Sequence, residues 1–325
     1  MARRVLVTDH VFAGLEPERS VLEPLDVEVE VASSADEEAL AAAARGAVGL
    51  LVCFAPVTGP VIEAAAQGGC RVIARYGIGY DNVDVEAATR AGIVVTNVPD
   101  YCLDEVADHT LALILAALRA VVPAAALVRE GAWERPPAAI HRLAGRRLAL
   151  LGLGNIGRRV AARARAFEFE VVAHDPYAAG PAPEGVTLVA ELEEALAGAD
   201  VVSLHTPLTE ETRHLVDARA IGLMRRAPVL VNTARGGLVD TDAVVAALDS
   251  GALSWAALDV LDTEPPPPDH PIRAHPRAIV TPHMAFHSEE AVEELQRRAA
   301  EEVARALRDE APDRPVNPEV VSSTS

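Results

Sequence analysis

Three polar side chains that could act together follow short apolar runs in the second half of the chain. Arg235, Glu264 and His283 each come a few residues after such a run. A guanidinium group can hold a carboxylate or a carbonyl oxygen in its planar fork, and a histidine can exchange a hydroxyl proton near neutral pH. A carboxylate bonded to the second imidazole nitrogen would fix the tautomer of that histidine. This combination suits a 2-oxo or 2-hydroxy acid.

Each of these residues also has a purely structural interpretation. Arg235 precedes two glycines and could be a solvated loop residue, Glu264 stands beside prolines and could belong to a turn, and His283 could be a satisfied histidine at a strand end. Ligands of open α/β sheets lie at the carboxyl ends of the strands, which favours the functional interpretation without deciding it. Other histidines remain candidates for the same role: His205, His275 and His287.

A glycine-rich turn lies inside the stretch 147–175, which has the pattern of a strand, a tight turn, a helix and a second strand. The turn has the spacing G-x-G-x-x-G. The first glycine permits the turn, the second lets a pyrophosphate approach the backbone, and the third lets the helix pack closely on the strand. The helix N-terminus then presents free N–H groups to the phosphates. The three glycines are Gly152, Gly154 and Gly157.

An acidic residue, Asp175, ends the second strand of this unit. A carboxylate at that position can accept hydrogen bonds from both hydroxyls of an adenosine ribose, and it would repel a 2′-phosphate. The unit is therefore predicted to bind NAD rather than NADP.

The composition excludes several classes of partner and chemistry. The net charge of −19 argues against nucleic acid and anionic membrane surfaces as partners. The chain has no lysine, so a lysine Schiff base is impossible. The three cysteines are widely spaced, which fits a reducing compartment and no structural zinc. The N-terminus lacks the uninterrupted apolar run of a signal peptide, and Arg119 and Pro123 interrupt the longest apolar segment, 110–128. A cytoplasmic protein without a membrane span is expected.

Strands alternate with helices along most of the chain, which predicts parallel sheets covered on both faces. At this length two α/β domains are expected. The boundaries are expected to be discontinuous, with 1–98 and 287–325 in a substrate domain and 99–286 in a nucleotide-binding domain. The expected strands are 5–8, 27–31, 48–54, 71–75, 93–96, 148–151, 170–173, 201–204, 229–231, 256–258 and 278–280; the expected helices are 36–45, 60–67, 83–91, 103–121, 156–167, 192–196, 241–250 and 288–307.

The segment 122–146 interrupts this alternation. It contains Gly131, Trp133, Pro136 and Pro137 and has the composition of a loop. Loops this long inside a compact domain are usually functional or form interfaces. We interpret it as a dimerisation arm.

Four separated motifs resemble those of the D-isomer-specific 2-hydroxyacid dehydrogenases, and they follow one another over nearly the full chain. They are RYGIGYDNVD at 75–84, LLGLGNIGRRVA at 150–161, NTARGGLVD at 232–240, and ALDVLDTEP with TPHMAF at 257–265 and 281–286. Arg75 before YGIG, DPY after His174, and HMAFHSEE at 283–290 are most similar to the branch that contains the C-terminal binding proteins and the phosphoglycerate dehydrogenases.

The resemblance implies a Rossmann NAD-binding domain and a flavodoxin-like substrate domain with a cleft between them. It implies NAD-dependent interconversion of a D-2-hydroxy acid and its 2-oxo acid in a homodimer joined through residues about 100–146. Two alternatives remain: an NAD(H)-responsive, corepressor-like binding protein, and a dehydrogenase of a small oxyanion such as phosphite.

The resemblance also assigns roles to individual residues. Arg235 would orient the substrate, and His283 would be the acid/base with Glu264 as its carboxylate partner. The cofactor would contact Thr110, Gly152, Gly154, Asn155, Ile156, Gly157, Asp175, Thr206, Thr233, Ala234 and Asp259. The substrate would contact Arg75, Tyr76, Gly77, Ile78, Gly79 and Phe286.

Overall fold

The computed structural model describes residues 3–134, 139–178 and 180–322. The chain divides into two compact units. Unit 1 combines residues 1–101 with 288–325, and unit 2 is the continuous segment 102–287. The sequence prediction placed these boundaries after residues 98 and 286. The chain therefore crosses between the units twice.

Unit 1 is built on a five-stranded parallel sheet in the order β2-β1-β3-β4-β5. This is the flavodoxin-like order that the family resemblance implied. Its central strands are buried on both faces, as parallel sheets covered by helices require. The strands are β1 (Arg3–Val7), β2 (Val27–Val31), β3 (Ala47–Val52), β4 (Val72–Arg75) and β5 (Val94–Thr96).

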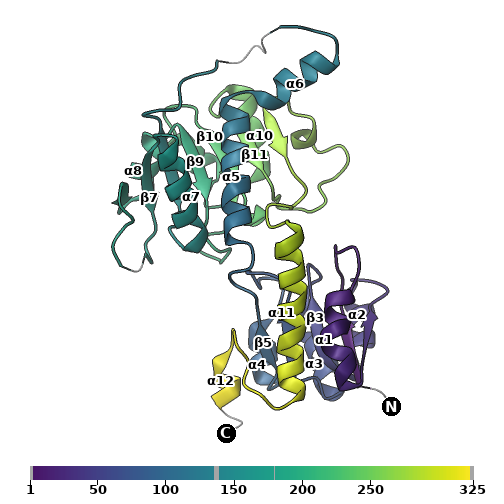
Figure 1. Ribbon diagram of the computed structural model, residues 1–325. Helices are drawn as coiled ribbons and strands as arrows, with labels where there is room; N and C mark the ends of the chain where they lie inside the picture. Colours follow the sequence, from purple (N-terminus) through teal and green to yellow (C-terminus); the bar gives the residue numbers. More distant parts are fainter. Residues whose placement is uncertain (1–2, 135–138, 179, 323–325) are drawn as a thin grey trace. The chain divides into compact units, whose positions relative to one another are not determined.

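Helices cover both faces of this sheet (Figure 1). The helices α2, α3 and α4 pack on one face around Leu50 and Ile73. On the other face α11, which follows unit 2 in the chain, packs on β3 and β4 beside α1. The helices are α1 (Glu16–Leu22), α2 (Glu37–Ala44), α3 (Gly59–Gln67), α4 (Val85–Arg90), α11 (Glu289–Leu307) and α12 (Pro318–Ser322).

The segment after α11 is tied to the edge of the sheet by a buried asparagine. Asn317 is 1% exposed, and its side-chain oxygen accepts a hydrogen bond from the Val95 amide at 2.8 Å. Its amide nitrogen donates to the Ile93 carbonyl at 3.0 Å. Unit 1 thus depends on the last part of the chain for one face of its sheet and for the edge at β5.

Unit 2 contains a seven-stranded parallel sheet in the order β12-β11-β10-β9-β6-β7-β8. The first six strands in chain order have the Rossmann arrangement, and the order reverses between β6 and β9. Ligands bind at the carboxyl ends of strands beside such a reversal. The strands are β6 (Arg147–Leu151), β7 (Glu170–His174), β8 (Val186–Val189), β9 (Val201–Leu204), β10 (Val229–Asn232), β11 (Trp255–Leu258) and β12 (Ala278–Val280).

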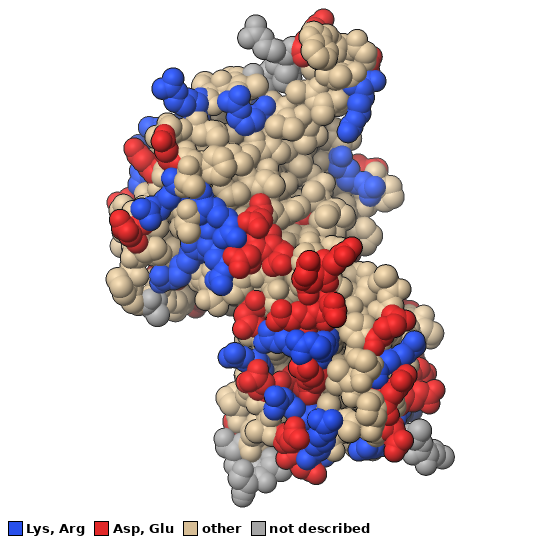
Figure 2. Space-filling view, in the orientation of Figure 1, with Lys and Arg blue, Asp and Glu red and all other residues tan. Residues whose placement is uncertain are grey.

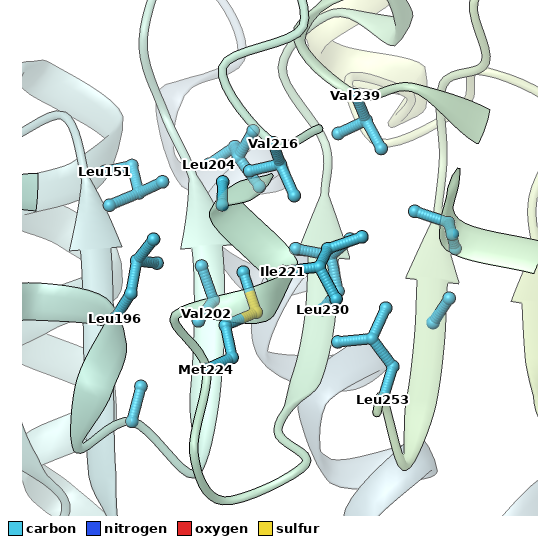
Figure 3. Close-up of a cluster of buried hydrophobic side chains, with 14 of the residues drawn as sticks. Leu151, Leu196, Val202, Leu204, Val216, Ile221, Met224, Leu230, Val239 and Leu253 are labelled. Atoms are coloured by element: carbon cyan, nitrogen blue, oxygen red, sulfur yellow. The ribbon is translucent and has the colours of Figure 1, made fainter. Parts of the chain in front are cut away.

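Alternate residues of these strands face two separate cores. Leu148 and Leu150 of β6 face α5 and α7, whereas Ala149 and Leu151 face α8, α9 and α10. Figure 3 shows the second core, in which Leu151, Val202, Leu204 and Leu230 from the sheet meet Leu196, Ile221 and Met224. The helices are α5 (Leu103–Leu118), α6 (Val121–Arg129), α7 (Asn155–Ala166), α8 (Leu192–Ala197), α9 (Ala218–Gly222) and α10 (Thr241–Ser250).

The prediction that 122–146 is a loop is wrong for its first part, because α6 occupies Val121–Arg129. Pro123 lies in the first turn of this helix, where its missing N–H has no intrahelical partner to lose. The preceding helix, expected to reach 121, ends at Leu118, and Ala120 adopts a left-handed conformation (φ 50°) that redirects the chain. No residue of α6 is buried. The residues 135–138, including Pro136 and Pro137, lie outside the described part of the chain.

One bent pair of helices meets a test of length and composition for a membrane span. Across 3–134, 139–178 and 180–322, no single helix is long and apolar enough to cross a membrane. The helices α5 and α6 meet the test only together, and they are bent by 64° at the break between them.

Candidate active site

The glycine-rich turn has the backbone geometry that its spacing predicted. Gly152 has φ 99°, and a Cβ atom there would lie 2.6 Å from the carbonyl oxygen of His205. A Cβ atom at Gly157 would lie 2.5 Å from the Gly152 oxygen, so the helix can pack this closely only with glycine. At Gly154 an added Cβ would meet no atom within 4 Å. The N-terminus of α7 therefore opens onto free space at the carboxyl end of β6, where phosphate groups can reach it.

Asp175 lies where the prediction placed it, directly after β7. One carboxylate oxygen accepts a hydrogen bond from the Leu153 amide at 2.8 Å, and the other accepts from the Tyr177 amide at 2.9 Å. The carboxylate thus connects the glycine-rich turn to the loop after β7. Each oxygen keeps lone-pair capacity for a further donor such as a ribose hydroxyl.

The loop after β9 contains a buried hydroxyl group without a hydrogen-bond partner in the described residues. The hydroxyl oxygen of Thr206, just after β9, is buried and has no hydrogen-bond partner in the described part of the chain. Buried polar atoms normally have partners, so an isolated one points to a ligand or an ordered water. The open space at Gly154 leaves room at this edge for the phosphate groups of a dinucleotide. Thr110 and Thr233 are bonded to each other at 2.8 Å beneath the same edge.

The histidine and glutamate of the predicted trio are in direct contact. His283 Nδ1 lies 2.7 Å from Glu264 Oε2, and the other Glu264 oxygen accepts a hydrogen bond from the Leu261 amide at 2.8 Å. The backbone therefore orients the carboxylate, and the carboxylate orients the imidazole. With Nδ1 as the donor to Glu264, Nε2 is left to exchange a proton. The Phe286 ring lies edge-on to this imidazole at 6.3 Å between ring centroids.

Arg235 follows β10 at the same edge of the sheet. The side chain of Asn232, the last residue of β10, donates to the Arg235 carbonyl at 2.8 Å and fixes the backbone of the turn. The Arg235 guanidinium is half-buried and donates to the Ala234 carbonyl at 2.8 Å. Because β10, β11 and β12 are adjacent parallel strands, the turns that carry Arg235, Glu264 and His283 share one edge.

The other histidines fit the acid/base role less well. The surrounding protein removes the His205 imidazole from water, and this burial lowers its pKa to about 4. It is therefore neutral at pH 7, and its Nε2 contacts Ser203 at 2.9 Å. His275 precedes β12 and so lies at the opposite end of the sheet. His287 is exposed and lies beyond the loop that carries His283.

Asp259, expected to contact the cofactor, is held by several hydrogen bonds from the loop that follows β12. It is 2% exposed, and its carboxylate accepts hydrogen bonds from the amides of Met284 at 3.0 Å and Ala285 at 2.8 Å and from the Thr281 hydroxyl at 2.5 Å. Its backbone carbonyl accepts from the His283 amide at 2.8 Å. Asp259 therefore organises the loop that carries the histidine.

In unit 1, the predicted substrate loop follows β4. The Arg75 side chain is buried, donates to the Tyr76 carbonyl and lies over the Phe54 ring at 6.0 Å. Gly77 has φ 144°, and a Cβ atom there would overlap the Arg75 guanidinium. The half-buried residues Ile78 and Gly79 continue the loop.

The expected contact between Tyr76 and the substrate stays a prediction, and the structure shows the surroundings of the Tyr76 side chain. Tyr76 is 2% exposed, and its hydroxyl donates to the buried carboxylate of Glu18 at 2.7 Å. Gln296 of α11 donates to the same carboxylate at 3.0 Å. Burial, with the negative charge of Glu18, raises the pKa of Tyr76 well above its ordinary value. Tyr76 therefore belongs to the interior of unit 1, a placement set by α1, a helix that the sequence analysis did not predict.

Ion pairs join the two helices beside the nucleotide site. Figure 2 shows arginine side chains gathered over α7 next to acidic side chains. Arg163 of α7 bonds Asp108 at 2.5 Å and Asp104 at 2.9 Å on α5. Exposed pairs of this kind contribute about 1 kcal/mol or less each. They support the packing of α5 on α7, and we assign them no part in ligand binding.

Comparison with known proteins identifies the family. Residues 111–285 match the model of the D-isomer specific 2-hydroxyacid dehydrogenase NAD-binding domain. The chain is 40% identical to a glyoxylate reductase of Korarchaeum cryptofilum over 272 residues, which cover 82% of this chain and 81% of that protein. The protein therefore belongs to the D-isomer specific 2-hydroxyacid dehydrogenase family, and unit 2 is its NAD-binding domain.

Further similarities agree with the branch inferred from the motifs. The chain is 40% identical to D-3-phosphoglycerate dehydrogenase of Methanocaldococcus jannaschii over 317 residues, 97% of this chain and 59% of the relative. It thus spans about three-fifths of the length of that relative. Among solved structures, the TT0316 protein of Thermus thermophilus is 41% identical with a TM-score of 0.86, covering 96% of this chain and 99% of that one.

Proposed function

We propose that the protein is an NAD-dependent oxidoreductase that interconverts a D-2-hydroxy acid and its 2-oxo acid. The observation that carries this proposal is the 2.7 Å contact between His283 and Glu264 at the sheet edge that also holds the glycine-rich turn. A domain that only bound nucleotide would have no use for an oriented acid/base pair. NAD, when bound, supplies or accepts the hydride.

The residues of unit 2 account for the remaining steps. The Arg235 guanidinium holds the oxygen of the reacting carbonyl or carboxylate and keeps the substrate in line with the cofactor. His283 Nε2 delivers a proton to the carbonyl oxygen during reduction, or removes it from the hydroxyl during oxidation. Glu264 keeps the imidazole in the required tautomer and orientation throughout.

We assign substrate recognition to unit 1. Backbone N–H groups of Ile78 and Gly79 are suited to a carboxylate, whereas the Gly77 N–H donates to the Arg75 carbonyl at 3.0 Å. Arg75 adds a buried cation beside them, which favours a substrate with a further negative or polar group. Relatives are named for 3-phosphoglycerate and for glyoxylate. We therefore expect the substrate to be a small 2-hydroxy acid or the corresponding 2-oxo acid.

A substrate panel tests this activity directly. NADH oxidation would be followed with glyoxylate, hydroxypyruvate, pyruvate, phenylpyruvate, 2-oxoglutarate and phosphonopyruvate, with NADPH in parallel. Selective turnover with NADH is expected. Binding of NADH without turnover of any member of the panel would contradict the proposed activity and favour a binding protein.

Asp175→Ala should weaken NADH binding and relax discrimination against NADPH, because the carboxylate that repels a 2′-phosphate is lost. We expect the ratio of kcat/KM for NADH to that for NADPH to fall about tenfold, or about 1.4 kcal/mol. Glu170→Ala is the matched control, since Glu170 is exposed at the opposite end of the same strand. An unchanged cofactor preference in the Asp175 variant would refute this role.

We propose that the protein is a homodimer joined through residues about 100–146, which include the arm at 122–146. The arm exposes large apolar side chains, with Val122 at 48% and Trp133 at 90% exposure. A hollow of about 890 Å³ lies at the amino-terminal end of the unit 2 sheet. Its lining includes the apolar side chains of Leu118 and Trp255, the charged side chain of Arg226, and Pro123 and Ala139 of the arm. In a symmetric dimer the arm of each copy can lie in the hollow of the other copy.

Trp133→Ala should shift the protein from dimer to monomer, because it removes the most exposed aromatic anchor of the arm. Light scattering coupled to size exclusion over a concentration series would report the mass. Phe167→Ala removes another exposed aromatic side chain far from the arm in sequence and should leave the mass unchanged. A monomeric wild-type protein would contradict the proposal, as would a Trp133 variant as dimeric as the wild type.

A further inference from the structure

We infer that His109 and Thr281 are positioning residues for His283, acting through Asp259. The inference rests on the proposed role of His283 as the acid/base. His109 lies on α5 and Thr281 in the loop after β12, 172 positions apart in the chain. The roles drawn from the family resemblance did not include either residue.

The three side chains form a continuous polar chain behind the histidine loop. His109 Nε2 lies 3.2 Å from the Thr281 hydroxyl oxygen and 3.6 Å from one Asp259 carboxylate oxygen. The Thr281 hydroxyl lies 2.5 Å from that same carboxylate oxygen. The Asp259 side chain is 1% exposed, so water does not compete for these bonds.

The direction of the hydrogen bonds follows from the available protons. A carboxylate accepts only, so Thr281 must donate its single hydroxyl proton to Asp259. The Thr281 oxygen then accepts from His109, which requires the proton of His109 to be on Nε2. His109 therefore holds the Thr281 hydroxyl in the one orientation that bonds Asp259.

Asp259 connects the side chains of Thr281 and His109 to the loop that carries His283. Its carboxylate accepts from the amides of Met284 and Ala285, and its carbonyl accepts from the amide of His283. His283 has φ 51°, a left-handed conformation that is unfavourable for residues other than glycine and persists only where the surroundings enforce it. The bonds to Asp259 enforce it here. A change at Thr281 or His109 should therefore displace the imidazole without touching it.

The position of the two residues in the chain adds to this role. The helix α5 begins directly after the first crossing between the units, and the loop of Thr281 leads to the second crossing after residue 287. The bond between His109 and Thr281 thus fastens together, inside unit 2, the two segments through which the chain reaches unit 1.

Thr281→Val is the direct test, since it removes the hydroxyl and keeps the shape. We expect kcat for 2-oxo acid reduction to fall up to about 100-fold, the size of effect that a displacement of about 1 Å produces. Affinity for NADH, measured by fluorescence titration, should stay within about twofold. Thr281→Ser should restore most of kcat, and His109→Ala should lower it in the same direction. Thr187→Val, at an exposed position of β8, is the matched control and should behave as wild type.

A second comparison separates positioning from general destabilisation. In a His283→Ala background the imidazole is gone, so adding Thr281→Val should leave the residual turnover unchanged. An equal loss in both backgrounds would overturn the inference, and so would wild-type kcat in Thr281→Val alone. If His283→Ala keeps the wild-type kcat, the proposed acid/base role of His283 is wrong, and with it the proposed function. If His283→Ala lowers kcat but Thr281→Val does not, only the positioning role is refuted.

Discussion

His283→Ala should reduce kcat for the 2-oxo acid by about 10²–10⁴, the usual contribution of a positioned general acid or base. The structure gives the reason, because His283 Nδ1 lies 2.7 Å from a carboxylate oxygen of Glu264, which orients the imidazole. Steady-state turnover at saturating NADH measures the loss. NADH binding should survive, since the glycine-rich turn and Asp175 are separate from this side chain.

His287→Ala is the informative comparison for this variant. His287 is exposed and lies only four positions further along the chain. It should retain near-wild-type turnover. A large loss in His287→Ala together with an active His283→Ala would transfer the acid/base role to His287 and remove the main support for the proposed mechanism.

Arg235→Ala should lower kcat/KM for the 2-oxo acid by about 10²–10³, as expected when a donor to the reacting oxygen is removed. Lysine at this position keeps the charge but loses the planar fork, so Arg235→Lys should recover only part of the activity. The loss should be specific to the acid, with little change in the affinity for NADH. Substrate saturation curves at fixed NADH would show it.

The control for Arg235 is another arginine of unit 2. Arg219 is exposed on α9, and Arg219→Ala removes the same charge away from the carboxyl edge of the sheet. Equal effects of the two substitutions would indicate a loss of overall positive charge rather than of a substrate contact. Wild-type kcat/KM in Arg235→Ala would exclude the assigned role.

The features predicted correctly from the sequence are those that depend on local pattern. The unit β6–α7–β7 is specified by two apolar runs, three glycines and one acid within 29 residues of chain. The positions of Arg235, Glu264 and His283 after β10, β11 and β12 follow from the same pattern. Where the pattern weakens, the prediction failed: β8 is an edge strand with exposed central residues, and α1 buries only Glu18 and Leu22.

The parts of the site that the sequence could not predict depend on contacts between distant segments. The burial of Tyr76 depends on Glu18, 58 positions earlier in the chain. The role of Asp259 in shaping the histidine loop depends on bonds to Met284 and Ala285, which no periodicity indicates. The residue types in the sequence indicated candidates for the active site, and the packing of separate elements determines which other side chains contact those candidates.

The division of unit 1 into two chain segments has a consequence for how the protein is made on the ribosome. The helix α11, which covers one face of the unit 1 sheet, and Asn317, which seals its edge at β5, are translated only after all of unit 2. Because synthesis proceeds at about 5–20 residues per second, roughly ten to forty seconds pass between the completion of the unit 1 strands and the synthesis of α11. Unit 2 is continuous and can complete its own core in that interval. The nascent chain therefore exposes one apolar sheet face throughout this period, which makes the first hundred residues the part of the chain that most needs protection from aggregation before synthesis ends.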